Sequence, residues 1–379
     1  MPIVSSQYQN TKGAGSVARR ADFPWLTALV ASVLCAPLFA FAAAVPAGYP
    51  RSYANRVSEA NEEGRLSIYS TTDAREVDEL LRHFRSMYPQ IVVDYADINS
   101  TEMYSRFVAE VAAKEGTADL LWSSAMDLQI KLVNDGYAQA YASPEKPNLP
   151  PWAIWKNEAY GITAEPVVIV YNKHLVPAAD VPRTRADLER LLTNNPAYAG
   201  KVAMMNPERS GVGFLYITQD LQVTRDTWRL VRAMGRSRVQ LYSSVGAVLD
   251  RVSSGDHLIA YNMIGSYALE RAVRDPSIGV VLPNDYTLVA SRIALIPADA
   301  RHPAAAKLFL DYLLSKRGQT FLARKHMTPV RGDVEVPEGT QVDGSNMRAI
   351  RVGPELLANL DQIKRLRFLR EWRSALKQD

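Results

Sequence analysis

Residues 65–84, RLSIYSTTDAREVDELLRHF, join a short apolar stretch, a run of hydroxyl residues and an amphipathic segment. The stretch 65–70 is typical of a buried strand. Beyond it, apolar residues recur at helical spacing, at Val77, Leu80, Leu81 and Phe84. A strand that passes directly into a helix is one unit of a mostly parallel sheet covered by helices. The segment therefore predicts an α/β fold.

The same strand-then-helix unit recurs along the chain. Further strands are predicted at 91–97, 119–124, 201–206, 239–244 and 257–262. Two long apolar runs, 165–172 and 286–297, separate two sets of units. We therefore expect two lobes joined by two crossing segments, with a ligand cleft between the lobes. The expected domains are lobe 1 (45–168 plus 287–345), lobe 2 (169–286) and a C-terminal amphipathic helix (346–379) packed on lobe 1.

The N-terminus has the pattern of a secretory signal peptide. Residues 1–22 are polar and net basic, residues 23–44 are apolar, and the run ends in alanines, which favours cleavage after Ala44. An uncleaved membrane anchor is the alternative, because about 20 apolar residues can span a bilayer. The single cysteine, Cys35, lies inside this segment. We therefore expect an exported, periplasmic protein without disulfides.

Composition excludes several classes of function. The chain carries 44 basic and 40 acidic residues without a basic tract, so we expect no nucleic-acid partner. The five histidines are scattered without metal-binding spacing, which argues against a metal centre. No G-x-S-x-G motif or phosphate-binding glycine loop is present. We therefore expect a monomer that is not an enzyme and has no cofactor.

Hydroxyl residues lie where predicted strands pass into helices. Helix N-termini present free N–H groups that bind anions, and ligands of open α/β sheets lie at the carboxyl ends of strands. Each hydroxyl could instead cap its own helix. We favour binding because several such turns would converge on one cleft. The candidate ligand-binding residues of this kind are Ser70, Thr71, Thr72, Ser123, Ser124, Ser210, Gly211 and Ser244.

Four larger side chains complete the candidate site: Trp122, Arg209, Asn262 and Tyr267. Trp122 could stack on a ligand or fill the core. Arg209 could pair with an anion or remain on the surface. Asn262 and Tyr267 follow a predicted strand and could reach the cleft or pack within their loop. Asp73, with Glu76 three residues later, is interpreted as a capping box.

Several ordered segments resemble one protein family. Besides 65–84, they are ADLLWSSAMD (118–127), MNPERSGVGF (205–214), SSGDHLIAYNMIGSYALERA (253–272) and KLFLDYLLSKRGQTFLARKHMTPVRGD (307–333). Together with the signal peptide they resemble the iron(III)-type solute-binding proteins of bacterial ABC importers, over about residues 65–335. The resemblance implies a two-lobed type II periplasmic binding fold. It also implies closure by hinge motion and docking on an inner-membrane permease.

The resemblance leaves the ligand open. Ferric members hold iron with a histidine, a glutamate and adjacent tyrosines. The matching positions here are Asp73, Ser123 or Ser124, and Tyr267 followed by Ala268. Hydroxyl and amide groups with Arg209 suit an organic anion better, such as an organophosphate, a phosphonate or a carboxylate. Capture of such a solute for an ABC permease is our hypothesis, and the alternatives are ferric iron transport and ligand sensing for a two-component kinase.

Overall fold

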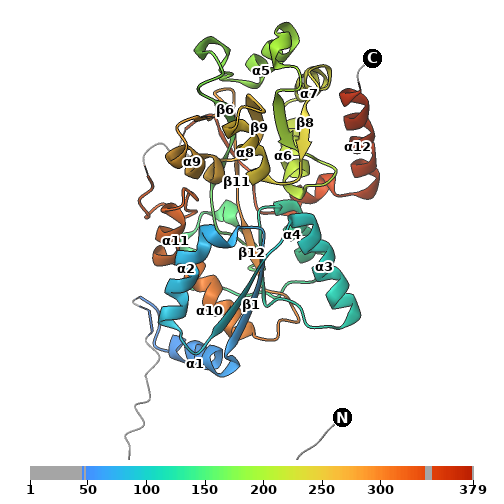
Figure 1. The fold of residues 1–379 in the computed structure, drawn as a ribbon. Helices are drawn as coiled ribbons and strands as arrows, with labels where there is room; N and C mark the ends of the chain where they lie inside the picture. Colours follow the sequence, from blue (N-terminus) through green and yellow to red (C-terminus); the bar gives the residue numbers. More distant parts are fainter. Residues whose placement is uncertain (1–44, 47, 338–343, 378–379) are drawn as a thin grey trace, which may run out of the picture. The chain divides into compact units, whose positions relative to one another are not determined.

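Two mixed β-sheets carry the helices of the chain. The computed structural model describes residues 45–46, 48–337 and 344–377 (Figure 1). The predicted signal peptide, residues 1–44, lies outside these described residues. Among the residues that the structure describes, no helix is both long enough and apolar enough to cross a membrane.

The first sheet has the strand order β2-β1-β3-β12-β5-β4. Its parallel strands are β1 (Arg65–Ser70), β2 (Val92–Asp97) and β3 (Leu120–Ser123). Its antiparallel part consists of β12 (Ile293–Leu295), β5 (Ala159–Gly161) and β4 (Ile154–Trp155). The first sheet therefore combines the N-terminal units with a strand from much later in the chain.

Helices cover both faces of the first sheet. One face packs on α1 (Tyr53–Glu63), α2 (Ala74–Met87), α10 (Pro303–Leu314) and α11 (Lys316–Ala323). The other face packs on α3 (Ser100–Ala113) and α4 (Met126–Asn134). Side chains alternate between these two cores, as Leu120 and Leu121 do. We call this sheet with its helices the first lobe.

The second sheet has the order β13-β11-β6-β9-β7-β8, with β10 paired to β6. Its strands are β6 (Glu165–Asn172), β7 (Val202–Met205), β8 (Gln240–Tyr242), β9 (Ile259–Ile264), β10 (Ile278–Val281), β11 (Thr287–Ala290) and β13 (Met347–Ala349). Its helices are α5 (Arg185–Asn194), α6 (Gly211–Val223), α7 (Thr227–Arg236), α8 (Val245–Ser253) and α9 (Gly265–Arg274). We call this sheet with these helices the second lobe.

The chain crosses between the sheets twice. The first crossing lies between Gly161 and Glu165, and the second between Ala290 and Ile293. Strand β11, which sequence analysis assigns to lobe 1, instead pairs with β6 of the second sheet. The long apolar run 286–297, predicted as a crossing segment, is divided between the two sheets: β11 pairs with β6 and β12 pairs with β3.

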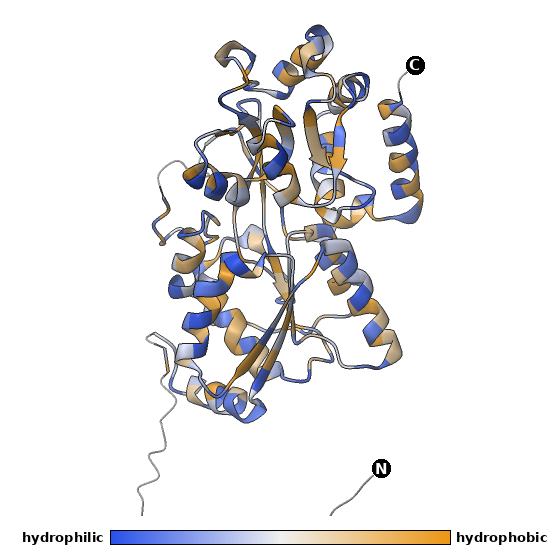
Figure 2. Cartoon of the chain, in the orientation of Figure 1, coloured by the Kyte–Doolittle hydropathy of each residue, from blue (hydrophilic) through white to orange (hydrophobic). Residues whose placement is uncertain are grey.

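The C-terminal helix packs on the second lobe, so its predicted position on lobe 1 is wrong. Helix α12 (Gln362–Leu376) contacts α7, and Trp372 is fully buried in the core of the second sheet. The short 3₁₀ helix η5 (Pro354–Asn359) instead contacts α4 of the first lobe. Figure 2 shows α12 as a mixture of hydrophilic and hydrophobic residues. Such a pattern identifies an apolar face without identifying the surface that covers it.

The remaining short 3₁₀ helices lie in connections. They are η1 (Lys146–Asn148), η2 (Pro151–Ala153), η3 (Ala178–Asp180) and η4 (Pro196–Tyr198). The first two lie in the proline-rich segment that precedes β4, and the last two lie on either side of α5.

Candidate functional site

A cavity of about 220 Å³ lies between the two lobes. The first lobe contributes Thr71, Asp73, Asp97, Ile98, Asn99, Ser100 and Ser124. The second lobe contributes Met205, Ser210, Val212, Ser243, Ser244, Val245, Gly246, Ile264 and Tyr267. The N-terminal ends of α2, α3, α6, α8 and α9 and the turn before α4 therefore all border this cavity, which we call the cleft cavity.

The hydroxyl residues of the second lobe cap their helices and border the cavity at the same time. Ser210 Oγ accepts a hydrogen bond from Gly213 N at 3.2 Å, and Ser244 Oγ accepts one from Ala247 N at 3.4 Å. A hydroxyl that accepts from its own helix keeps its proton for another acceptor. Capping and ligand binding, which sequence analysis weighed as alternatives, are therefore compatible at these positions.

The two hydroxyls of the first lobe support each other. Ser124 N donates to Thr71 Oγ1 at 3.0 Å, and the two side-chain oxygens lie 3.1 Å apart. Because β1 and β3 are neighbours in the sheet, their carboxyl ends place Thr71 and Ser124 side by side. The pair forms one wall of the cavity.

Tyr267 joins the two lobes across the cavity. Its hydroxyl donates to Asp73 Oδ1 at 2.8 Å and accepts from Asp73 N at 3.1 Å. Asp73 makes no side-chain cap on α2, and its other oxygen lies 3.2 Å from the Arg75 guanidinium. The capping box with Glu76 is therefore wrong, because a tyrosine from the other lobe uses the Asp73 carboxylate instead.

The charged side chains that line the cavity are acidic. Asp73 and Asp97 border it, and no Lys, Arg or His is among the described residues that do so. Asp97 Oδ2 accepts from Ala74 N at 3.2 Å. Burial and the nearby negative charge of Asp73 raise the pKa of Asp97 above its usual value.

Five of the candidate residues of sequence analysis meet in this cavity: Thr71, Ser124, Ser210, Ser244 and Tyr267. Sequence analysis missed Asp97, Asn99 and Ser100, which follow β2 as the hydroxyl residues follow β1 and β3. The rule that ligands lie at the carboxyl ends of strands could have found them.

Ser70 and Ser123 point away from the cavity. Ser70 Oγ accepts from Thr72 N at 3.1 Å, and Ser123 Oγ accepts from Ala125 N at 3.1 Å. Both side chains are buried. These two serines therefore shape the turns that present Thr71 and Ser124.

Thr72 belongs to a buried polar network beneath the cavity. Its Oγ1 accepts from the Arg292 guanidinium at 2.8 Å. Arg292 also pairs with Glu165 at 2.8 Å, and it donates to Ser266 Oγ at 3.4 Å. Arg292 follows β11, at the second crossing between the sheets, so this network ties both lobes together where the chain passes between them.

Trp122 and Asn262 serve the interior of the protein. Trp122 is fully buried, because strand alternation places it on the sheet face that α2 and α10 cover. Asn262 Nδ2 donates to Asp220 Oδ2 at 2.7 Å. Asp220 also accepts from Tyr261 and pairs with Arg185. Neither candidate lines the cleft cavity.

Arg209 and Gly211 flank Ser210 without lining the cavity. Arg209 is exposed. Gly211 is buried against the first lobe, where an added Cβ would lie 3.0 Å from Ala125 Cβ and from Ser100 Oγ. Gly211 therefore allows α6 to approach α3 and α4 closely, which is a packing role.

Three positions that match ferric ligands border the cleft cavity: Asp73, Ser124 and Tyr267. Among the described residues, no group of three or more His, Cys, Asp or Glu side chains is placed to hold a metal ion. Asp73 and Tyr267, two of the positions that match ferric ligands, hydrogen-bond to each other. Hydroxyl groups and helix N-termini border the same cavity.

Comparisons with known proteins place the chain in a family. Residues 115–348 match the family described as bacterial extracellular solute-binding protein. The substrate-binding protein of an ABC transporter from Agrobacterium tumefaciens is 40% identical with a TM-score of 0.78, over 83% of this chain and 94% of that one. The periplasmic binding protein AfuA from Actinobacillus pleuropneumoniae, with fructose-6-phosphate bound, shares the fold at 18% identity. Its TM-score is 0.70 over 83% of this chain and 99% of that one.

A curated relative matches over a shorter stretch. The phosphoglycerate transport regulatory protein PgtC of Salmonella typhimurium is 30% identical over 130 residues. The match spans 34% of this chain and about a third, 32%, of that relative. The family match and the Agrobacterium structure extend much further, and both describe binding proteins rather than enzymes. This two-lobed α/β chain belongs to the family of bacterial extracellular solute-binding proteins.

Proposed function

We propose that this chain is the periplasmic solute-binding protein of an ABC-type importer and captures a small anionic solute. The observation that carries the proposal is the cleft cavity, which both lobes line and on which several helix N-termini converge. The predicted signal peptide and the likeness to an ABC-transporter substrate-binding protein support export and transport. An inner-membrane permease is the corresponding partner.

Helix N-termini supply the positive end of the binding site. Each N-terminus carries a partial positive charge of about half an elementary charge and leaves N–H groups without partners inside the helix. Ser210 and Ser244 lie at two of these N-termini and keep hydroxyl protons available. The anionic group of the solute is therefore held by N–H and O–H donors rather than by a basic side chain.

The two carboxylates indicate a second property of the solute. Asp73 and Asp97 border the same cavity, and carboxylates accept hydrogen bonds. A solute with an anionic group and with hydroxyl or ammonium groups fits this cavity. Its anionic group accepts from the helix N-termini, and its other groups donate to the two carboxylates. Phosphoglycerate and fructose 6-phosphate, named for two similar proteins, are both phosphates that carry hydroxyl groups, and this supports the assignment.

Native mass spectrometry of the mature protein, purified without refolding, tests the solute class. We expect a bound organic anion and substoichiometric iron by elemental analysis. Stoichiometric iron without an organic anion would overturn the proposal in favour of ferric transport, with Asp73 and Tyr267 as the protein's oxygen ligands.

A Ser210→Ala, Ser244→Ala double variant tests the position of the site. We expect about a tenfold to hundredfold loss of affinity for 3-phosphoglycerate in calorimetry, because two hydrogen bonds to a charged group are lost. Arg209→Ala is the matched control, since this arginine is adjacent but exposed, and its affinity should not change. If wild type, the double variant and Arg209→Ala bind 3-phosphoglycerate with equal affinity, the solute does not bind at Ser210 and Ser244.

A sensor kinase is a second candidate partner. The PgtC match favours it, because that relative is named a transport regulatory protein. Crosslinking of the loaded protein in intact cells, followed by mass spectrometry, separates the two partners. We expect permease peptides, and exclusive recovery of kinase peptides would replace the permease with a sensor.

A further inference from the structure

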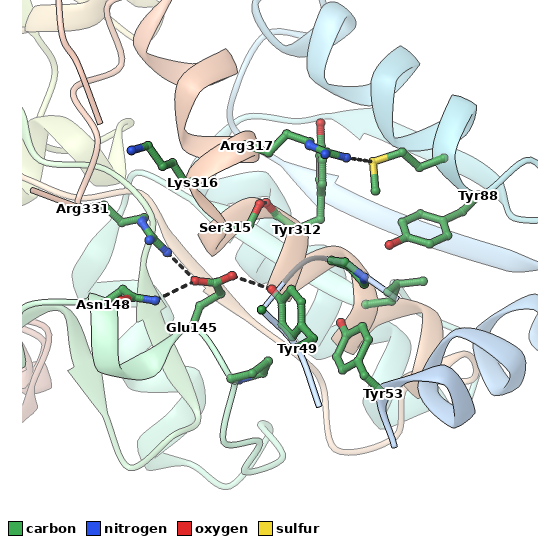
Figure 3. A pocket seen from close by; sticks show the side chains of 15 residues that line it. Tyr49, Tyr53, Tyr88, Glu145, Asn148, Tyr312, Ser315, Lys316, Arg317 and Arg331 are labelled. Atoms are coloured by element: carbon green, nitrogen blue, oxygen red, sulfur yellow. Dashed lines mark hydrogen bonds and ion pairs between the residues drawn. The ribbon is translucent and has the colours of Figure 1, made fainter. Parts of the chain in front are cut away.

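A second cavity, of about 340 Å³, lies on the first lobe and shares no lining residue with the cleft cavity. The segment before α1, the C-terminal end of α2 and the start of α11 surround it (Figure 3). Its wall consists of Pro46, Gly48, Tyr49, Tyr53, Met87, Tyr88, Pro144, Glu145, Asn148, Leu308, Tyr312, Ser315, Lys316, Arg317 and Arg331. We call it the lobe 1 cavity.

The start of α11 gives this cavity an edge of positive potential. Ser315 caps the helix by accepting from Gly318 N at 3.1 Å. The first N–H groups of a helix, here those of Lys316 and Arg317, have no partners within the helix. Both side chains are exposed, and neither forms an ion pair among the described residues. Within the described part of the chain, the Arg317 guanidinium forms a hydrogen bond to the weak acceptor Met87 Sδ, at 3.2 Å, and to no carboxylate.

Tyr88 adds a donor that has no acceptor. Its side chain is 4% exposed, and its hydroxyl forms no hydrogen bond within the part of the chain that the structure describes. Figure 3 shows the Tyr88 hydroxyl directed toward the other lining side chains. Burial raises the pKa of Tyr88 to about 12, so the hydroxyl is protonated at neutral pH and can donate. Because Tyr88 lines the cavity, its hydroxyl can donate to a ligand bound there.

The other tyrosines of the cavity have partners. Tyr49 donates to Glu145 at 2.6 Å, Tyr53 donates to Asp311 at 2.7 Å, and the Tyr312 hydroxyl lies 2.9 Å from His83 Nδ1. Tyr88 is therefore distinct from them in facing the cavity with a free hydroxyl. Among the described tyrosines of the lining, Tyr88 is therefore the one whose hydroxyl is available to a ligand.

The opposite wall is neutralised and largely aromatic. Glu145 forms an ion pair with Arg331 and accepts from Asn148 at 3.1 Å, so its charge is already balanced. The rings of Tyr49 and Tyr53 stack with centroids 4.5 Å apart. The cavity thus has unpaired cations and donors at one end and a ring-lined wall at the other.

We propose that the lobe 1 cavity is a second binding site, independent of the cleft, for a small organic anion with an apolar body. The anionic oxygens lie against the first turn of α11, the Arg317 guanidinium and the Tyr88 hydroxyl. The apolar body lies against the Tyr49 and Tyr53 rings. Carboxylates and phosphate esters share this chemistry, and the probes below distinguish them.

Calorimetric titration of the mature protein with benzoate and with phenyl phosphate tests the proposal. Benzyl alcohol is the neutral control, because it has the same ring without the charge. We expect one equivalent of at least one anion to bind and no binding of benzyl alcohol. The stronger of the two anions then identifies the carboxylate or the phosphate class. Equal binding of benzyl alcohol, or no binding of either anion at millimolar concentration, would overturn the proposal.

Variants then locate the site. Tyr88→Phe removes one hydroxyl and should weaken anion binding about tenfold, and Arg317→Ala should weaken it at least as much. Arg324→Ala is the matched control, because Arg324 ends the same helix without lining the cavity, and the Ser244→Ala variant reports on the cleft. Unchanged affinity in both Tyr88→Phe and Arg317→Ala, or loss of anion binding in Ser244→Ala, would contradict a site in lobe 1.

Discussion

Arg292 is a buried cation with partners in both lobes. Its side chain is 1% exposed and pairs with Glu165 at 2.8 Å. Arg292→Ala should lower the free energy of unfolding by about 3–5 kcal/mol, because Glu165 is left charged and unpaired. Urea denaturation measures the change. The Arg292→Met, Glu165→Gln double variant should recover much of this loss, because it leaves no unpaired charge. A free energy of unfolding of Arg292→Ala within about 1 kcal/mol of wild type would argue against a tight ion pair.

Asp127 makes stability depend on pH. Burial raises its pKa from 3.8 to about 7 in the folded chain, against the opposing effects of the Leu128 N–H and Arg365. Between these two values the folded chain keeps a proton that the unfolded chain has released. The contribution of Asp127 therefore lowers stability as pH rises through this range, by about 1.4 kcal/mol for each pKa unit, and it levels off above the folded pKa.

Asp127→Asn removes this dependence. Scanning calorimetry gives the melting temperature of the variant minus that of wild type at each pH. This difference should be more positive at pH 8 than at pH 4. Asp135→Asn on the same helix is the control, because Asp135 is partly exposed and pairs with Lys131. A difference in melting temperature that is the same at both pH values would contradict the assignment.

Sequence patterns predict which turns border the cleft cavity better than they predict which side chains line it. The hydroxyl residues after β1, β3 and β8 all lie near the cleft, because parallel strands end at one edge of a sheet. Whether a given hydroxyl faces the cavity depends on turn geometry, which separates Thr71 from Ser70. Arg292 was missed because the apolar run around it resembles an ordinary strand.

At the scale of elements, the C-terminal segment is the informative case. Gly235 of α7 has no room for a side chain, since an added Cβ would lie 2.7 Å from Ala375 O. Trp372 is fully buried beside α7, and the Phe368 and Phe214 rings meet edge-on at 5.2 Å. Burial of the tryptophan therefore fixes α12 on the second lobe.

Trp372→Ala tests this docking. The loss of a large buried side chain should cost about 3–5 kcal/mol of stability, measured by urea denaturation. Ile363→Ala is the control on the same helix, because Ile363 is 77% exposed and should cost little. Equal effects of the two changes would mean that α12 is not held by its tryptophan.

Elements themselves were largely predictable, and their partners were not. Each strand followed by a helix is encoded locally, by apolar period and turn residues. Helix α12 packs on α7 because Gly235 leaves room for its backbone. The apolar pattern of α12 does not reveal this fit. The division of residues 286–297 between two sheets is equally nonlocal, since β11 pairs with β6 and β12 pairs with β3.

For the whole molecule, the hydrogen bonds between Tyr267 and Asp73 link the two lobes at the cleft cavity. Tyr267→Phe removes the hydroxyl that bridges the lobes and should lower affinity for 3-phosphoglycerate about tenfold. Small-angle scattering should also show less contraction on binding. Tyr242→Phe is the control, because its hydroxyl contacts His257 within the second lobe. Unchanged affinity and contraction in Tyr267→Phe would show that this contact does not stabilise closure.

The position of β12 also constrains the order in which the chain can fold. This strand lies between β3 and β5, yet it is made long after both. A chain that emerges from its N-terminus leaves two sheet edges unpaired until about residue 295, while β6 to β11 form an almost continuous stretch. The first sheet is therefore completed late, although β13 and α12 of the second lobe are made later still. Until β12 is made, the open edges of β3 and β5 offer unpaired N–H and C=O groups to strands of other chains, which favours aggregation of a partly made chain.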